Sequence, residues 1–168
     1  MLASVHSYEL DLKPSWSEVE GLRQFIGPWV YALVRIPDVR DAVATVSAEL
    51  LENAIRYGHP DVGAIGYRID VGEEHVRVSV TNRCVPGKGD PERAEERVRW
   101  IERFEDSTEA YREQVRRVAR GESGGLGLVR IAAEGHSRLR CSTRADTLEM
   151  EATTRFRKRP ISGGCLLQ

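Results

Sequence analysis

The segment Val46-Ser-Ala-Glu-Leu-Leu-Glu-Asn-Ala-Ile-Arg-Tyr-Gly-His-Pro60 decides the fold prediction, because it belongs to the strongest helical pattern in the chain. From residue 39 to residue 57, apolar residues recur at helical spacing over a wide arc. Gly58 followed by Pro60 is the order typical of a helix C-terminus. The sequence therefore predicts a long, largely buried helix at the centre of the fold.

The elements around this helix predict an α+β protein. Alternating apolar residues predict strands, and helical spacing predicts further helices. The predicted strands are 6–12, 64–71, 75–80, 137–143 and 147–156, and the other predicted helices are 15–34, 91–120 and 128–134. Ser15 with Glu18 predicts a capping box, and Gly27-Pro28 predicts a kink or break in the first helix. We expect a two-layer α/β sandwich with a mixed, mostly antiparallel sheet and helices on one face.

The near-zero net charge argues against a nucleic-acid-binding domain, and the density of charged residues distinguishes the segment 91–120. The 168 residues hold 25 Lys and Arg against 26 Asp and Glu, a net charge of −1, whereas a nucleic-acid-binding domain is usually basic. Residues 91–120 carry eight acidic and eight basic side chains, which predicts two solvated helices broken near Asp106. The apolar residues expected to anchor this block are Val98, Trp100, Ile101, Phe104, Val115 and Val118. We expect one domain over 1–157, with 91–120 inserted, and a flexible tail over 158–168.

Other features of the composition predict a cytoplasmic protein. The three cysteines are widely spaced and form neither a disulfide framework nor a zinc pattern. The chain shows no secretory signal pattern and no run approaching the roughly 18 apolar residues of a membrane helix. Apolar Trp16, Phe25 and Trp29 in the first helix are expected in the core, with a homodimer contact as the alternative.

Glu49 and Asn53 form the first candidate site. They are four residues apart, so they share one side of the long helix, and Asn53 lies where its polar and apolar arcs meet. A carboxylate there can act as a general base, while an amide oxygen can ligate Mg²⁺. The alternative is that both are ordinary solvated helix residues.

The glycine-rich stretch Gly124-Gly-Leu-Gly127 forms the second candidate site. Glycines before a helix allow backbone N–H groups to approach an anion closely, so a phosphate is the expected guest. A hinge or tight turn is the alternative. Arg116, Arg117 and Arg120 lie just upstream, where they either close over the same phosphates or form a solvated helix face.

Together the two motifs resemble the N-box and second glycine box of histidine-kinase-like (GHKL, or Bergerat-fold) ATP-binding domains. Within that superfamily the chain resembles stand-alone bacterial anti-sigma-factor serine/threonine kinases and switch kinases that act on STAS-domain partners. The resemblance implies ATP and Mg²⁺ as cofactors, with Glu49 activating the acceptor hydroxyl or water and Asn53 holding the metal. It also places the glycine box against the phosphates, through Gly124, Gly125, Leu126 and Gly127.

The chain departs from that pattern at the first glycine box. Asn82 stands where the superfamily has an adenine-binding Asp, and the glycines that follow, Gly87 and Gly89, come late. A neutral acceptor weakens the hydrogen bond by about 1 kcal/mol. The resemblance places 91–120 at the position of the ATP lid. The expected function is phosphorylation of a small STAS-like partner. The alternatives are a catalytically weak module that captures a STAS-like or sigma-factor partner and a detached histidine-kinase catalytic domain.

Overall fold

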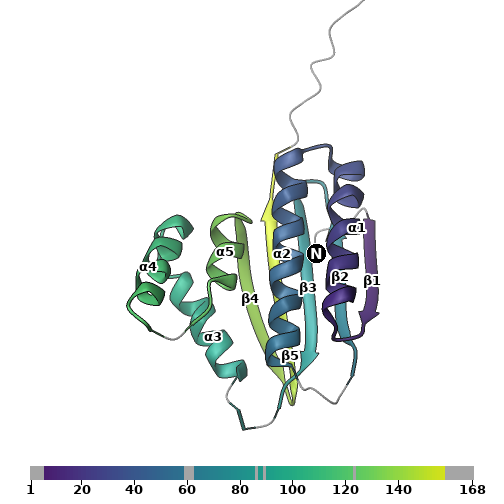
Figure 1. Ribbon diagram of the computed structural model, residues 1–168. Helices are drawn as coiled ribbons and strands as arrows, with labels where there is room; N and C mark the ends of the chain where they lie inside the picture. The colour runs from purple at the N-terminus through teal and green to yellow at the C-terminus, as the bar shows by residue number, and fades with distance from the viewer. Residues whose placement is uncertain (1–5, 59–62, 86, 89, 123, 158–168) are drawn as a thin grey trace, which may run out of the picture.

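The protein is a two-layer α+β sandwich, as expected from the sequence (Figure 1). The computed structural model describes residues 6–58, 63–85, 87–88, 90–122 and 124–157. The elements are β1 (His6–Leu12), α1 (Trp16–Val34), α2 (Pro37–Tyr57), β2 (Ile65–Val71), β3 (His75–Arg83), α3 (Asp90–Ile101), α4 (Ser107–Ala119), α5 (Gly127–Ala133), β4 (Ser137–Arg144) and β5 (Thr147–Arg155). The predicted tail, 158–168, lies outside the described residues.

One five-stranded sheet, in the order β1-β2-β3-β5-β4, forms the second layer. Each pair of neighbouring strands is antiparallel, so the expectation of a mixed sheet is wrong for the described residues. β4 and β5 form a hairpin whose second strand pairs with β3, and this arrangement needs no parallel crossover.

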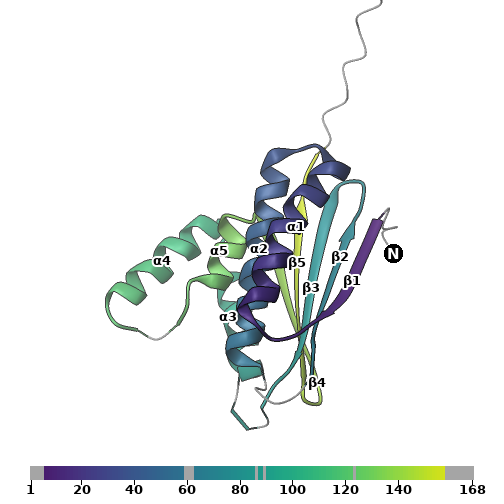
Figure 2. The same ribbon diagram turned by 45° about the vertical axis from the view of Figure 1, so that its right-hand side comes forward.

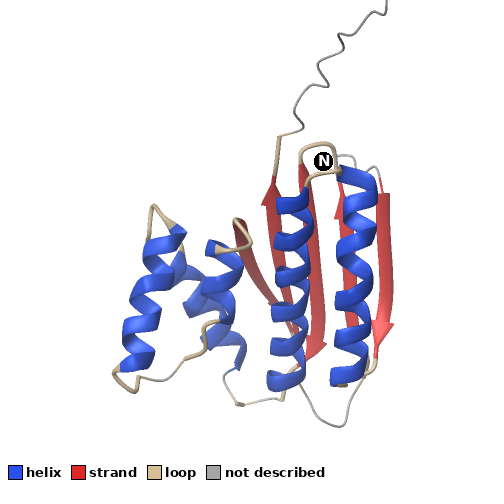
Figure 3. Cartoon of the chain, turned by 45° about the horizontal axis from the view of Figure 1, so that its top comes forward, coloured by secondary structure: helices blue, strands red, loops and turns tan. Residues whose placement is uncertain are grey.

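The core lies between the sheet and helices α1, α2 and α5, which cover the same face (Figures 1 and 3). Tyr67, Ile69 and Val78 point from the strands into this core, and Val43 meets them from α2. Burying each such side chain contributes about 1.5–3 kcal/mol. The opposite face of the sheet carries polar residues such as Arg68, so only one face is packed.

Helix α1 begins as predicted and continues through the predicted break. The Ser15 hydroxyl accepts from the Glu18 backbone N–H at 3.4 Å, which is half of the predicted capping box. The helix runs without interruption past Pro28. Both Pro28 and Gln24, whose carbonyl loses its helical donor to the proline, are exposed, so water can replace that donor.

The prediction that the aromatic residues of α1 are buried in the core is wrong for two of them. Trp16 is 56% and Phe25 is 44% exposed, whereas Trp29 is partly buried and its ring centre lies 5.9 Å from that of Tyr8. A single short edge strand, β1, lies under this side of α1 and cannot cover all the rings. Among the described residues, no helix is long and apolar enough to cross a membrane.

Strand β3 is longer than predicted. The predicted strand ends at residue 80, but Asn82 pairs with Leu148 inside β3 and is buried. Arg83 pairs with Thr147, so β5 extends the strand beyond its apolar alternation. As a result Asn82 lies on the helix-facing side of the sheet, two residues after Val80.

Helices α3 and α4 form a helical insert, residues 90–119, that projects from the β4 side of the sheet (Figure 2). The predicted break lies just before α4, where Asp106 caps the helix by accepting from the Thr108 N–H at 2.8 Å. Val98 and Ile101 are buried and Trp100 and Phe104 partly buried, as predicted, but Val115 and Val118 are about 40% exposed. The inward side of α4 is formed instead by Ala110 and Gln114, one turn apart and both fully buried.

Candidate functional site

A cavity of about 980 Å³ lies between α2, the sheet, the helical insert and the glycine-rich segment. This volume is at the upper end of the range typical of small-molecule sites. Apolar side chains from α2, β3 and β5 line its inner part, namely Leu50, Ala54, Val80, Leu148 and Met150. Asn82 adds a polar group to this wall. An apolar wall with one polar group suits a flat heterocyclic base.

The helical insert makes the cavity cationic. The charged residues that line it are Arg93, Arg97, Arg99, Arg103 and Arg117, with Asp90 and Glu96. The insert as a whole is nearly neutral, so its fold turns an excess of arginines toward the cavity. A surplus of guanidinium groups attracts a polyanion such as a polyphosphate.

Two of these arginines share one aromatic ring. The guanidinium carbons of Arg97 and Arg117 lie 5.3 and 4.8 Å from the centre of the Trp100 ring. Burial, together with repulsion from Arg117, lowers the pKa of Arg97. Among the described residues no carboxylate lies within ion-pair distance of Arg97, and its Nη1 donates to the Gln114 Oε1 at 2.6 Å. Arg97 is thus a half-buried cation without a counter-ion in the part of the chain that the structure describes.

Glu49, Asn53 and Gly127 converge where α2 meets the start of α5. A β-carbon added to Gly127 would lie 2.6 Å from the Glu49 Oε2 and 3.4 Å from the Asn53 Nδ2. The absence of a side chain at Gly127 therefore leaves space beside both groups. The Glu49 side chain is only 13% exposed, so Glu49 is not an ordinary solvated helix residue.

Glu49 is also ion-paired. The Arg130 Nη1 donates to the Glu49 Oε1 at 2.5 Å, and the Arg130 Nε lies 3.6 Å from a carboxylate oxygen of Glu134. The hydrogen bond to Glu49, with the charge of that carboxylate, raises the pKa of Arg130. The pair joins two residues that are 81 positions apart in the sequence, one in α2 and one in α5.

The remaining glycine-box residues have different surroundings. Gly124 has φ +134°, and a β-carbon there would overlap the Arg97 guanidinium, so both conformation and space favour glycine. Its carbonyl accepts from the Gln114 Nε2 at 3.4 Å. Gly125 lines the cavity with open space beside it, whereas Leu126 packs partly buried against the core.

The residues at the position of the first glycine box line the cavity only in part. Gly87 is exposed, has φ +80° and does not line the cavity, and Gly89 lies outside the described residues. Of the three upstream arginines, Arg117 lines the cavity, whereas Arg116 and Arg120 are exposed. The structure thus brings Asn53, Asn82 and the second glycine box to one cavity, but not Gly87.

The donor set at Asn53 fits Mg²⁺ held together with phosphates. Within the described ranges, no group of three or more His, Cys, Asp or Glu could hold a metal ion on its own. Mg²⁺ typically keeps several waters and takes one or two protein oxygens with substrate phosphates. Asn53 lines the cavity between the apolar wall and Gly127, so its amide oxygen can supply that protein ligand.

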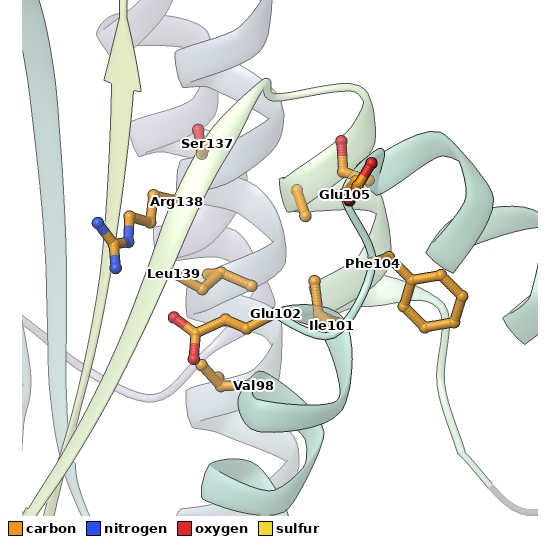
Figure 4. A pocket seen from close by; sticks show the side chains of 10 residues that line it. Val98, Ile101, Glu102, Phe104, Glu105, Ser137, Arg138 and Leu139 are labelled. Carbon is orange, nitrogen blue, oxygen red and sulfur yellow. The ribbon is translucent and has the colours of Figure 1, made fainter.

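A second cavity, of about 500 Å³, lies between the end of α3, α5 and the start of β4. Figure 4 shows Val98 and Ile101 facing Leu139, while Arg138 points away from the helices. Its charged lining includes Glu102, and none of the predicted site residues takes part. The larger cavity is therefore the candidate site.

Three polar residues of the site were not identified from the sequence. Arg97 is one of eight arginines in a mixed-charge block, and nothing in the spacing distinguishes it. Gln114 is a polar residue in a segment expected to be solvated, yet it is fully buried. Arg130 had a usable signal, because it follows Gly127 by three residues and so shares a face of α5 with it.

Comparisons with known proteins establish the fold. No known family model matches the sequence, and no curated protein matches it significantly. Among solved structures, a chain in the crystal structure of the SiaB–SiaC complex from Pseudomonas aeruginosa is similar, with a TM-score of 0.69. The two chains are 21% identical, and the match covers 89% of each. At this identity the similarity shows a common fold across nearly the whole chain.

Proposed function

We propose that the protein is a cytoplasmic, ATP·Mg²⁺-binding regulatory serine/threonine kinase of the partner-switching type. The observation that carries the proposal is that Asn53 and Gly127 line a large cavity with an apolar wall and a cationic wall, while the Glu49 Oε2 lies beside Gly127 without lining the cavity itself. This arrangement supplies a carboxylate that can act as a base and an amide that can bind a metal. It also leaves space for phosphates beside Gly127 and supplies arginines that can neutralise their charge. Phosphoryl transfer needs mainly these positioning and electrostatic groups.

Each residue has a distinct role in this proposal. The apolar wall and Asn82 bind the adenine, and the second glycine box lies against the phosphates. Asn53 holds Mg²⁺, which when bound neutralises phosphate charge. Glu49 accepts the proton of the acceptor hydroxyl, and the arginines of the helical insert stabilise the charge on the transferred group.

The proposed substrate is a small regulatory protein with a STAS-like fold. The similar solved chain comes from a complex of two proteins, SiaB and SiaC, which supports a role that depends on a protein partner. In partner switching, phosphorylation of one partner changes which protein is bound. A homodimer through the exposed Trp16 and Phe25 side of α1 remains part of this proposal.

The test measures transfer of the terminal phosphate of ATP to the partner protein whose gene lies nearest to the gene for this chain. Glu49→Ala should abolish transfer, because the base is lost, while thermal unfolding still shows a folded protein. Glu52→Ala, a partly exposed carboxylate on the same helix, is the matched control and should transfer normally. Unchanged transfer by Glu49→Ala would remove Glu49 from its assigned role.

A second candidate function is stoichiometric capture of a partner, such as a STAS-like protein or a sigma factor, by a catalytically weak scaffold. The neutral Asn82 in the adenine-binding position, with Gly87 away from the cavity, favours it. Calorimetry with ATP·Mg²⁺ separates the two functions. Heat of binding that is lost in a Gly127→Val variant supports the kinase, and no binding at millimolar nucleotide supports the scaffold.

A further inference from the structure

We propose that Arg130 is a positioning residue that holds the Glu49 carboxylate in the orientation used for phosphoryl transfer. The inference rests on the proposed kinase function and adds to it a residue to which neither sequence motif assigned a role. It assigns Arg130 no contact with nucleotide, because Arg130 does not line the cavity.

The two oxygens of the Glu49 carboxylate have different surroundings. Oε1 accepts from the Arg130 Nη1 at 2.5 Å, whereas Oε2 points to the space beside Gly127. The guanidinium therefore fixes one oxygen and leaves the other facing the phosphate-binding segment. A proton acceptor must point at the hydroxyl it deprotonates, so the free Oε2 is the oxygen suited to that task.

Arg130 is itself held in place by its helix. Val129 and Ile131, its neighbours in α5, are fully buried, so the backbone at Arg130 is anchored in the core. Glu134, one turn further along, lies on the outer side of the guanidinium at 3.6 Å. A long glutamate side chain without such a partner has several rotamers available, and the ion pair selects one.

The hydrogen bonding of Arg130 points to the same role. Its Nε is buried and has no acceptor within hydrogen-bond distance among the described residues. Leaving a buried donor unsatisfied carries a free-energy cost. The side chain thus adopts a position that satisfies Glu49 rather than all of its own donors, and no other described cation lies within ion-pair distance of Glu49.

The test compares kcat with KM. Arg130→Ala should lower kcat for phosphoryl transfer by about 10- to 100-fold, the size of effect expected when a reacting group is misplaced by about 1 Å. KM for ATP should stay within about twofold, because substrate contacts are unchanged. Arg130→Lys should recover part of the loss, and guanidinium ion at a non-denaturing concentration should raise kcat of Arg130→Ala. Arg140→Ala, which removes an exposed arginine of β4 outside the cavity, is the control and should keep kcat.

The outcomes separate this inference from the proposed function. No transfer by the wild-type protein overturns both. Normal transfer by the wild type with an unchanged kcat for Arg130→Ala overturns the positioning role alone. A loss of kcat that guanidinium does not restore, accompanied by a lower melting temperature, identifies Arg130 as a structural residue and likewise overturns the inference.

Discussion

The two sides of the cavity are built differently. On one side, the α2–α5 corner (Glu49, Asn53, Gly127 and Arg130) stands on helices whose inward residues, such as Leu50, are fully buried in the main core. On the other side, the helical insert is anchored by a few buried side chains, of which one, Gln114, is polar. The corner thus stands on helices with many buried residues, whereas the insert is joined to the same core by only a few.

In the proposed function, this difference assigns a separate task to each side of the cavity. In that function a base and a metal ligand need fixed geometry, which the well-anchored corner is suited to provide. Arginines that neutralise phosphate can approach after binding, and segments with few buried apolar contacts are the ones that open locally. We therefore expect substitutions in the corner to affect transfer most and substitutions in the insert to affect affinity and local stability.

The largest expected effect is at Gly127. Gly127→Ala places a β-carbon 2.6 Å from the Glu49 Oε2 and forces the carboxylate away, so transfer should fall by about 100-fold or more. The measurement is single-turnover transfer, with circular dichroism to verify folding. Gly21→Ala, on an open part of α1 with no neighbour within 4 Å, is the control. If the Gly127→Ala variant transfers phosphate at the normal rate, the α2–α5 corner is not the rigid side of the site.

An intermediate effect is expected at Arg97. Arg97→Ala removes a half-buried cation and should weaken ATP·Mg²⁺ binding by about 10-fold, equal to about 1.4 kcal/mol. The loss should shrink as salt concentration rises, because salt screens the attraction between Arg97 and the phosphates in the wild-type protein. Calorimetry measures the dissociation constant of ATP·Mg²⁺ at low and at high salt concentration. Arg112→Ala, an exposed arginine of α4, should bind normally, and equal losses in the two variants would show a nonspecific charge effect.

The smallest effect is expected at Gln114. Its side chain accepts from Arg97 and donates to the Gly124 carbonyl, so Gln114→Ala should destabilise the insert by about 1–2 kcal/mol. Hydrogen exchange should become faster across 90–119 while α2 stays protected. Val118→Ala, on the exposed side of α4, should change neither the stability of the insert nor its hydrogen exchange. Faster exchange in α2 as well would mean that insert and corner unfold as one unit.

Most of the fold was predictable from local patterns. The long helix and its end at Gly58, the positions of the five strands and the division of the insert near Asp106 were all predicted. Predictions that depended on neighbours in space were wrong. Phe25 fits an apolar helical stripe yet is 44% exposed beside Tyr8 of the edge strand β1, and Asn82 lacks a strand pattern yet pairs with β5.

The candidate site was predictable to the extent that it lies in motifs. Glu49, Asn53 and the second glycine box could be singled out because the spacing of residues on a helix and the order of glycines are local properties. Val115 and Val118 were expected to anchor the insert, but hydrophobicity alone does not show which side of α4 faces inward. The role of Arg97 depends on a partner 17 residues away, and no local pattern indicates it. The spacing of Arg130 from Gly127 places both on one face of α5, but its partner Glu49 is 81 residues away and only packing brings the two together.

The sequence by itself thus determined the elements, the α+β class and the two motifs, because periodicity, caps and glycines act over a few residues. The tertiary structure decided which charges meet. Packing α5 against α2 brings Gly127 and Arg130 to opposite oxygens of Glu49. Folding the insert turns arginines from a nearly neutral segment toward one cavity. Distances between side chains far apart in the chain arise only when the core brings their helices together.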